Sequence, residues 1–119
     1  MSDYPGTPGK TTIAPEVLLT IARLTTLNVS GVCRMSTTPP VNVNRLFKRG
    51  INEGIYIEVQ DDAVFADIYV ILCSGFNIRE VGQNIQREVA RAISEMVGMQ
   101  VGRVNIHVED IDFLSEAEA

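Results

Sequence analysis

Residues 55–73 read IYIEVQDDAVFADIYVILC, two strand-like runs on either side of a short polar turn. Apolar and polar residues alternate over 55–60, which is the period-two pattern of a strand with one buried face. Residues 63–73 are rich in valine, isoleucine, phenylalanine and tyrosine. Asp61 and Asp62 separate the two runs, so the stretch predicts a tight antiparallel hairpin whose second strand lies centrally in a sheet.

An amphipathic helix is predicted directly after the hairpin, with Gly98 as its C′ stop. Asn77 precedes this helix, and Glu80 follows three residues later. The Asn77 side chain can accept a hydrogen bond from first-turn N–H groups, and the negative charge of Glu80 interacts favourably with the helix dipole. The residues expected on the buried face recur with the helical period: Ile78, Val81, Ile85, Val89, Ala92, Ile93 and Met96. We expect this helix to cover the sheet along its whole length.

A shorter helix is predicted before the hairpin, starting at Pro15 as residue N1, where a missing N–H costs nothing. Residues 10–13 are expected to pair as an edge strand before it, and residues 32–36 form a short candidate strand after it. The helix is expected to bury one apolar stripe: Val17, Leu18, Ile21, Leu24 and Leu27.

The last strand is predicted at residues 101–110 from a second period-two pattern. The element order is therefore α-β-β-β-α-β. It predicts an α+β fold, a two-layer sandwich with a mainly antiparallel sheet of three to five strands and two main helices on one face. We expect one domain over 11–113, a flexible N-terminal arm at 1–10 and an acidic disordered tail at 114–119.

The sheet face turned away from the helices is expected to carry aromatic and charged side chains. Two interpretations of this face remain. It is ordinary solvated surface, which antiparallel sheets tolerate, or a patch that binds a partner, because exposed aromatic rings stand among polar groups. The predicted interaction face consists of Tyr56, Glu58, Phe65, Asp67, Tyr69, Arg103, Asn105 and His107, with Gln60 and Glu109 in the same alternation.

Charge and composition limit the partners and the compartment. The net charge of −5 and the pI of about 4.8 repel polyanions, so nucleic acid is not the expected partner. Residues 1–10 lack the apolar segment of a secretory signal, and the longest apolar run, 68–73, is too short to span a bilayer. We therefore expect a cytoplasmic protein without direct membrane insertion. Cys33 and Cys73 form no CxxC pair, which favours two free thiols over a single disulfide.

Catalytic and metal-binding motifs are absent from the sequence. His107 is the only histidine, so no familiar His-containing metal set can be assembled. Neither cysteine has a local activating group, and no GxSxG, Walker-type or HExxH motif occurs. We predict no catalytic, cofactor-binding or metal-binding residues, no cofactor and no enzymatic activity.

The long connection at 37–53 carries the one local basic patch. A short helical turn near 43–48 is expected there, because seventeen residues without structure are unusual in a compact domain. The basic loop contains Arg45, Phe47, Lys48 and Arg49. A basic loop with an aromatic residue can bind phosphate backbones, which leaves a KH-like nucleic-acid-binding domain as the alternative function. The GxxG loop that a KH site requires is not found between the helices.

Residues 54–113 resemble the alkaline shock protein family, the envelope stress response proteins of mainly Gram-positive bacteria. The most characteristic pieces are GFNI at 75–78, the helix after it, Gly98 and VNIHV at 104–108. Residues 13–36 are similar to the opening helix and the "GV" strand of that family. The resemblance implies a cytoplasmic, non-enzymatic protein that binds other protein chains and forms a homo-oligomer. It also implies recruitment to the inner face of the cell membrane by a membrane-anchored partner protein.

Overall fold

The computed structural model describes residues 9–36, 51, 52 and 54–113, with side chains described for 9–36 and 54–113. Its elements, in chain order, are α1 (Pro15–Leu27), β1 (Val32–Met35), β2 (Ile51–Asn52), β3 (Ile55–Gln60), β4 (Ala63–Cys73), α2 (Ile78–Ala92), η2 (Ile93–Val97) and β5 (Gln100–Asp112). Most of the predicted arm, the predicted turn at 43–48 and the predicted tail lie outside the described residues. The boundaries predicted for the arm, the domain and the tail remain predictions.

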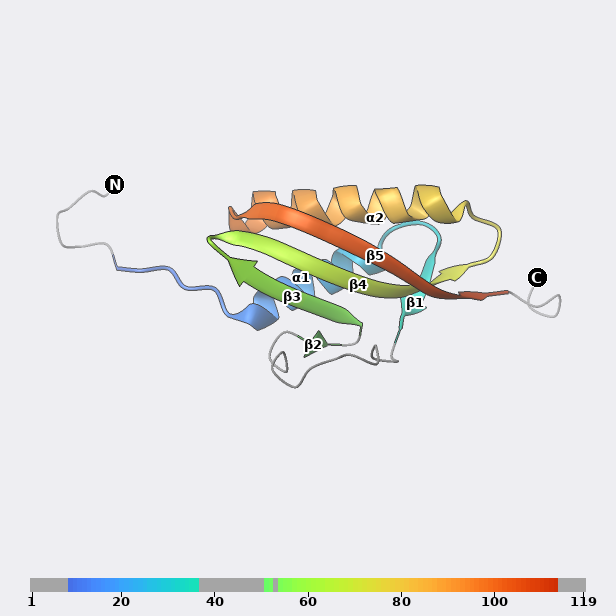
Figure 1. The fold of residues 1–119 in the computed structure, drawn as a ribbon, viewed down its shortest axis with the longest axis horizontal. Helices are drawn as coiled ribbons and strands as arrows, with labels where there is room; N and C mark the ends of the chain where they lie inside the picture. The colour runs from blue at the N-terminus through green and yellow to red at the C-terminus, as the bar shows by residue number, and fades with distance from the viewer. Residues whose placement is uncertain (1–8, 37–50, 53, 114–119) are drawn as a thin grey trace.

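Strand β4 lies at the centre of the sheet (Figure 1). Strand β3 pairs antiparallel with residues 63–68 of β4, and β1 pairs antiparallel with its residues 70–72. Strand β5 pairs with β4 in parallel along its whole length, because the connection between them crosses over through α2. Strand β2 extends the sheet beyond β3. The predicted α+β class is confirmed, with five strands and one parallel pair in a mainly antiparallel sheet.

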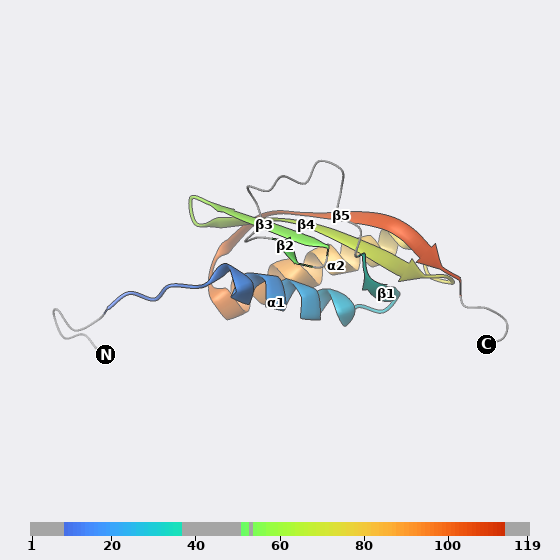
Figure 2. The same cartoon turned by 90° about the horizontal axis from the view of Figure 1, so that it is seen from below.

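Both helices lie on the same face of the sheet (Figure 2). The core fills the space between the two layers, and its largest fully buried apolar side chains come from β3, β4 and the second helix. Burying apolar surface in this way is the main favourable contribution to folding. The face of the second helix was predicted correctly for most of its length. Ile78 and Met96, at its two ends, are exposed contrary to prediction, at 45% and 71%.

The first helix differs from its prediction in which side chains it buries. Its buried residues are Leu18, Leu19, Ile21, Ala22 and Thr26. Val17, Leu24 and Leu27 were predicted to be buried, yet they are 45%, 53% and 38% exposed. Helix α1 is apolar on more than one side. The prediction from hydrophobic periodicity therefore assigned residues from two separate apolar stripes to a single buried one. Residues 10–13, predicted as an edge strand, form no strand.

The predicted helix signals and the hairpin turn are confirmed. Pro15 starts α1, and the Asn77 side chain accepts a hydrogen bond from the Glu80 backbone N–H at 2.8 Å. Gly98 ends the second helix in the left-handed conformation, after a final π-helical turn that the sequence did not indicate. Asp61 and Asp62 have φ of 51° and 67°, the left-handed values of a tight hairpin turn that matches strand twist.

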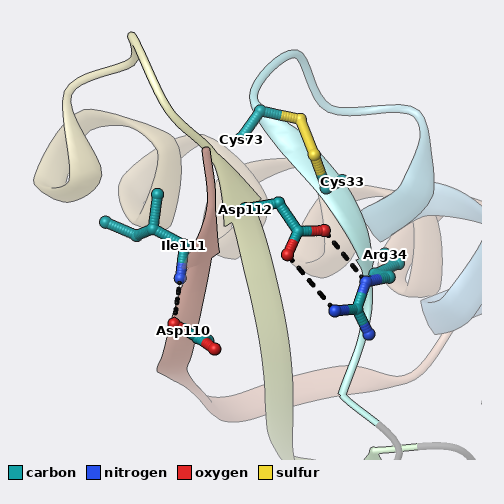
Figure 3. A network of polar contacts seen from close by, with 6 residues as sticks. All are labelled: Cys33, Arg34, Cys73, Asp110, Ile111 and Asp112. Carbon is teal, nitrogen blue, oxygen red and sulfur yellow. Dashed lines mark hydrogen bonds and ion pairs between the residues drawn. A yellow bond between two sulfur atoms is a disulfide. The ribbon is translucent and has the colours of Figure 1, made fainter. Parts of the chain in front are cut away.

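A disulfide joins Cys33 on β1 to Cys73 on β4, with the two Cα atoms 5.1 Å apart (Figure 3). The prediction of two free thiols is therefore wrong. Forty residues separate the cysteines in the chain, but the antiparallel pairing of β1 with the end of β4 brings them together. Sequence spacing does not reveal which strands are neighbours, so it could not show this bond.

Candidate interaction face

The open sheet face is defined here as the side of β3, β4 and β5 that points away from α1 and α2. Strand pairing places Tyr56 opposite Asp67, and Asp67 opposite Asn105. No described helix or strand covers this side of the sheet (Figure 2). The eight residues predicted for the interaction face lie together on it: Tyr56, Glu58, Phe65, Asp67, Tyr69, Arg103, Asn105 and His107.

Asp67 is the polar centre of the open sheet face. Its Oδ1 accepts a hydrogen bond from Asn105 Nδ2 at 3.1 Å and lies 3.0 Å from His107 Nε2. His107 donates to Asp67 when Nε2 carries the proton, so this contact favours the Nε2-protonated tautomer. The side chains of His107 and Asp67 remain 41% and 42% exposed. A partner can therefore reach a carboxylate and an imidazole that are already held in place.

Three rings continue the cluster across the strands. The His107 ring stacks on Tyr69 with centroids 4.3 Å apart, and Tyr56 meets Tyr69 edge-on at 5.6 Å. Burial raises the pKa of the Tyr56 phenol, with smaller contributions from Tyr69 and Glu109. Burial also raises the pKa of Tyr69, followed by the charges of Asp67 and Glu109. Both phenols therefore stay neutral at physiological pH, and the rings act as rigid contact surfaces.

The end of the open sheet face near the hairpin turn is shaped by Phe65. The Arg103 guanidinium lies 5.7 Å from the centroid of the Phe65 ring, within the range of a cation–π contact. A Cβ on Gly102 would lie 2.5 Å from this ring, so the glycine allows the ring to lie against the strand. A small cavity of about 120 Å³ between Tyr56, Glu58, Phe65 and Asp67 is open beside it. It is far smaller than the roughly 300–1,000 Å³ of typical ligand sites.

The opposite end is tied together by an ion pair that the sequence interpretation missed. Arg34 Nε and Nη2 donate to the two Asp112 carboxylate oxygens at 3.0 and 3.2 Å, which joins β1 to β5 across β4 (Figure 3). The hydrogen bond to Asp112, and then its charge, raise the pKa of Arg34. Ser36 Oγ also donates to Glu109 Oε1 at 3.1 Å. The one sequence signal for this contact was the alternation of residues 32–36, which places the Arg34 side chain on the exposed side of a short strand.

The geometry of the open sheet face suits binding more than catalysis. Asp67 and His107 form an acid–imidazole pair, yet both cysteines of the chain are in the disulfide and cannot act as nucleophiles beside it. In the stretches 9–36 and 54–113, no three His, Cys, Asp or Glu side chains are grouped to hold a metal ion. The predicted basic loop of Arg45, Phe47, Lys48 and Arg49 lies outside the described residues.

Comparisons with known proteins identify a family and two relatives for this chain. The alkaline shock protein 23 family, described as having a cell envelope-related function, has a profile that matches residues 4–113. YqhY, an uncharacterized protein of Bacillus subtilis, is 29% identical over 111 residues, covering 92% of this chain and 82% of that protein. Spy1535, an uncharacterized protein of Streptococcus pyogenes, is 35% identical over 104 residues, covering 87% of this chain and 79% of that protein.

A solved structure has a similar arrangement of helices and strands. A MamM CTD chain aligns with a TM-score of 0.49 and 10% identity over 80% of this chain and 95% of that chain. The family description names no reaction, and no enzymatic family is indicated. Among the described helices, none has the length and apolar character needed to cross a bilayer.

Proposed function

The chain belongs to the alkaline shock protein family, and we propose that it is a non-enzymatic interaction module whose open sheet face docks another protein chain. In this proposal the protein is cytoplasmic and self-associates. A membrane-anchored partner protein recruits it to the inner face of the cell membrane. The cell envelope-related function of the family supports a partner of this kind.

One observation carries the proposal: the connected cluster of Asp67, Asn105, His107, Tyr69 and Tyr56 on a side of the sheet that no described helix or strand covers. Hydrogen bonds and ring stacking hold these side chains before any partner arrives, so binding orders few additional groups. Preorganised aromatic surfaces with a polar surround are typical of the residues that contribute most to protein–protein affinity.

The same cluster supports a protein partner over a small molecule. The cavity beside Phe65 is about 120 Å³, too small for a typical ligand but large enough to receive part of a partner side chain. Glu58 and Asp67 bring two carboxylates to its rim, and Tyr56 and Phe65 bring two rings. A protein that inserts a basic or apolar side chain would match this surface.

The proposal is tested by capture of partners from a cytoplasmic extract and quantitative binding to any partner identified. Tyr69→Ala and Arg103→Glu each alter the open sheet face, whereas Phe76→Ala removes a ring that is 48% exposed near the start of the second helix. We expect the two face variants to lose the captured partner and Phe76→Ala to retain it, with unchanged far-UV circular dichroism in all three. Equal capture by all variants would refute docking on this face.

A further inference from the structure

We propose that the exposed apolar stripe of α1 is the contact through which two copies of the chain associate as an antiparallel, two-fold helix pair. This inference rests on the self-association included in the proposed function, and it assigns that association to a second surface. The α1 stripe is defined as Val17, Leu24 and Leu27, which are 45%, 53% and 38% exposed. It leaves the open sheet face free for the docking partner.

The geometry of α1 places these three side chains together. At 3.6 residues per turn, the directions of Val17, Leu24 and Leu27 fall within an arc of roughly 80°. The buried residues Leu18 and Ala22 point into the core on another side of the same helix. Thus α1 carries one apolar stripe for its own core and a second that the described part of the chain leaves in solvent.

Two further exposed apolar side chains lie near the ends of α1. Met96, 71% exposed, lines the same surface depression as Thr25 and Asn28 at the C-terminal end of α1. Ile13, just before α1, is 37% exposed. Charged side chains of the second helix line this depression as well, so the α1 stripe is defined by its own three residues; α1 lies on the layer of the molecule opposite the open sheet face (Figure 2). Exposed apolar side chains grouped on one side of a helix are typical of interaction sites.

The two charges of α1 select a second copy as the occupant and fix its direction. Glu16 and Arg23 are the only charged residues in Pro15–Leu27. They lie seven residues apart, two turns along one flank of the α1 stripe. No ion pair to either is found within residues 9–36 and 54–113. An antiparallel second copy centred near Thr20 brings Glu16 of each chain opposite Arg23 of the other.

The same register also aligns the apolar residues. Val17 of one copy then lies within a turn of Leu24 of the other, and the two-fold axis repeats each contact. A parallel pair would instead bring Glu16 against Glu16 and Arg23 against Arg23, which repel. One acid and one base give the helix no cationic face for anionic lipid, so a membrane surface is the less suitable occupant.

The expected association is weak, because a 13-residue helix is only about 20 Å long and the contact is correspondingly small. Sedimentation velocity over roughly 1 µM to 1 mM protein covers the range expected of such small interfaces. The wild-type chain should shift from monomer to dimer across this range and should not form larger species through α1 alone.

Charge exchange gives the sharpest test. Arg23→Glu and Glu16→Arg each place like charges across the pair and should raise the dimer dissociation constant. The double variant Glu16→Arg with Arg23→Glu restores opposite charges and should recover dimerisation. Leu24→Glu should weaken the dimer by at least roughly tenfold, since a desolvated apolar contact is lost. Ile78→Glu, at a position that is 45% exposed on α2, is the matched control and should dimerise as wild type.

Three results would overturn the assignment. A wild-type chain that stays monomeric at every concentration would do so, as would a double variant no better than the single ones. The third is binding of the monomeric wild type, but not Leu24→Glu, to 3:1 phosphatidylcholine–phosphatidylglycerol vesicles, which would make the stripe a lipid-binding surface. Partner capture by a monomeric Leu24→Glu chain tests the two proposals separately. If the open sheet face alone docks the partner, this variant should still capture the partner although it no longer dimerises.

Discussion

Replacing Gly54 with alanine should destabilise the protein by about 2–5 kcal/mol, far more than the same change at Gly75. Both glycines adopt left-handed φ, +86° and +94°, where an L side chain costs about 1–2 kcal/mol. They differ in what an added Cβ would meet. At Gly54 it would lie 2.5 Å from the Ser36 carbonyl oxygen and 2.8 Å from that of Tyr69, whereas at Gly75 nothing lies within 4 Å.

The clash at Gly54 cannot relax easily, because backbone hydrogen bonds join Tyr69 to both Ser36 and Gly54. Tyr69 O accepts from Ser36 N at 2.9 Å, and Tyr69 N donates to Gly54 O at 2.8 Å. Overpacking against such fixed atoms costs about 1–3 kcal/mol beyond the φ penalty. Gly54 thus holds the start of β3 close to β1 and β4, beneath Tyr69 of the open sheet face.

Urea unfolding followed by far-UV circular dichroism measures this difference, with the disulfide kept oxidised in each variant. At similar m values, the Gly54→Ala midpoint should lie about 1 M below that of Gly75→Ala. Equal midpoints would refute the argument that close backbone approach requires glycine at position 54, since the φ penalty is common to both.

Three further changes test other parts of the fold. Gly82→Ala should raise the free energy of unfolding by up to about 1 kcal/mol, because Gly82 lies within α2 and its Cβ would meet nothing within 4 Å; an unchanged or lower urea midpoint would contradict this. Reducing the bond between Cys33 and Cys73, which closes a forty-residue separation, should lower stability by roughly 2–4 kcal/mol in the same assay; equal midpoints for oxidised and reduced protein would argue against a structural role. Burial raises the folded-state pKa of Tyr56 and Tyr69, so the stability they contribute is complete below about pH 10 and is lost as pH rises through the folded pKa. Tyr56→Phe should flatten that alkaline loss in unfolding curves, and an identical pH profile would show that the phenol does not contribute.

The parts of the fold that local chemistry determines were predictable. The Asp61–Asp62 turn, the Asn77 cap and the Gly98 stop each depend on residues within a few positions of one another. Strand alternation alone predicted which side chains lie on the open sheet face, since successive side chains of a strand point to opposite sides. Its eight residues were therefore brought together as expected, although binding by them remains a proposal.

The contacts that join distant segments were not predictable. Cys33 meets Cys73, and Arg34 reaches Asp112 across β4. These contacts depend on the pairing of β1 with one side of β4 and β5 with the other, which no local pattern records. The exposed stripe of α1 was missed for a related reason. Hydrophobic periodicity shows that a residue is apolar, but not which of two apolar sides the core covers.

The two proposed surfaces have a combined consequence because they lie on opposite layers of the molecule (Figure 2). A dimer joined through α1 would present two open sheet faces outward. A membrane-anchored partner present in many copies would then be bound twice by one dimer, which strengthens attachment without any new contact. Self-association and recruitment would reinforce each other in this arrangement.

Site-specific photo-cross-linking in living cells can show whether the open sheet face docks a partner protein. A benzophenone amino acid is placed at position 65 on the open sheet face and, in a separate chain, at position 76 by the second helix. If the open sheet face docks a partner, irradiation should link position 65, but not position 76, to a discrete partner protein. Cross-links from neither position, or equally from both, would contradict docking on the open sheet face.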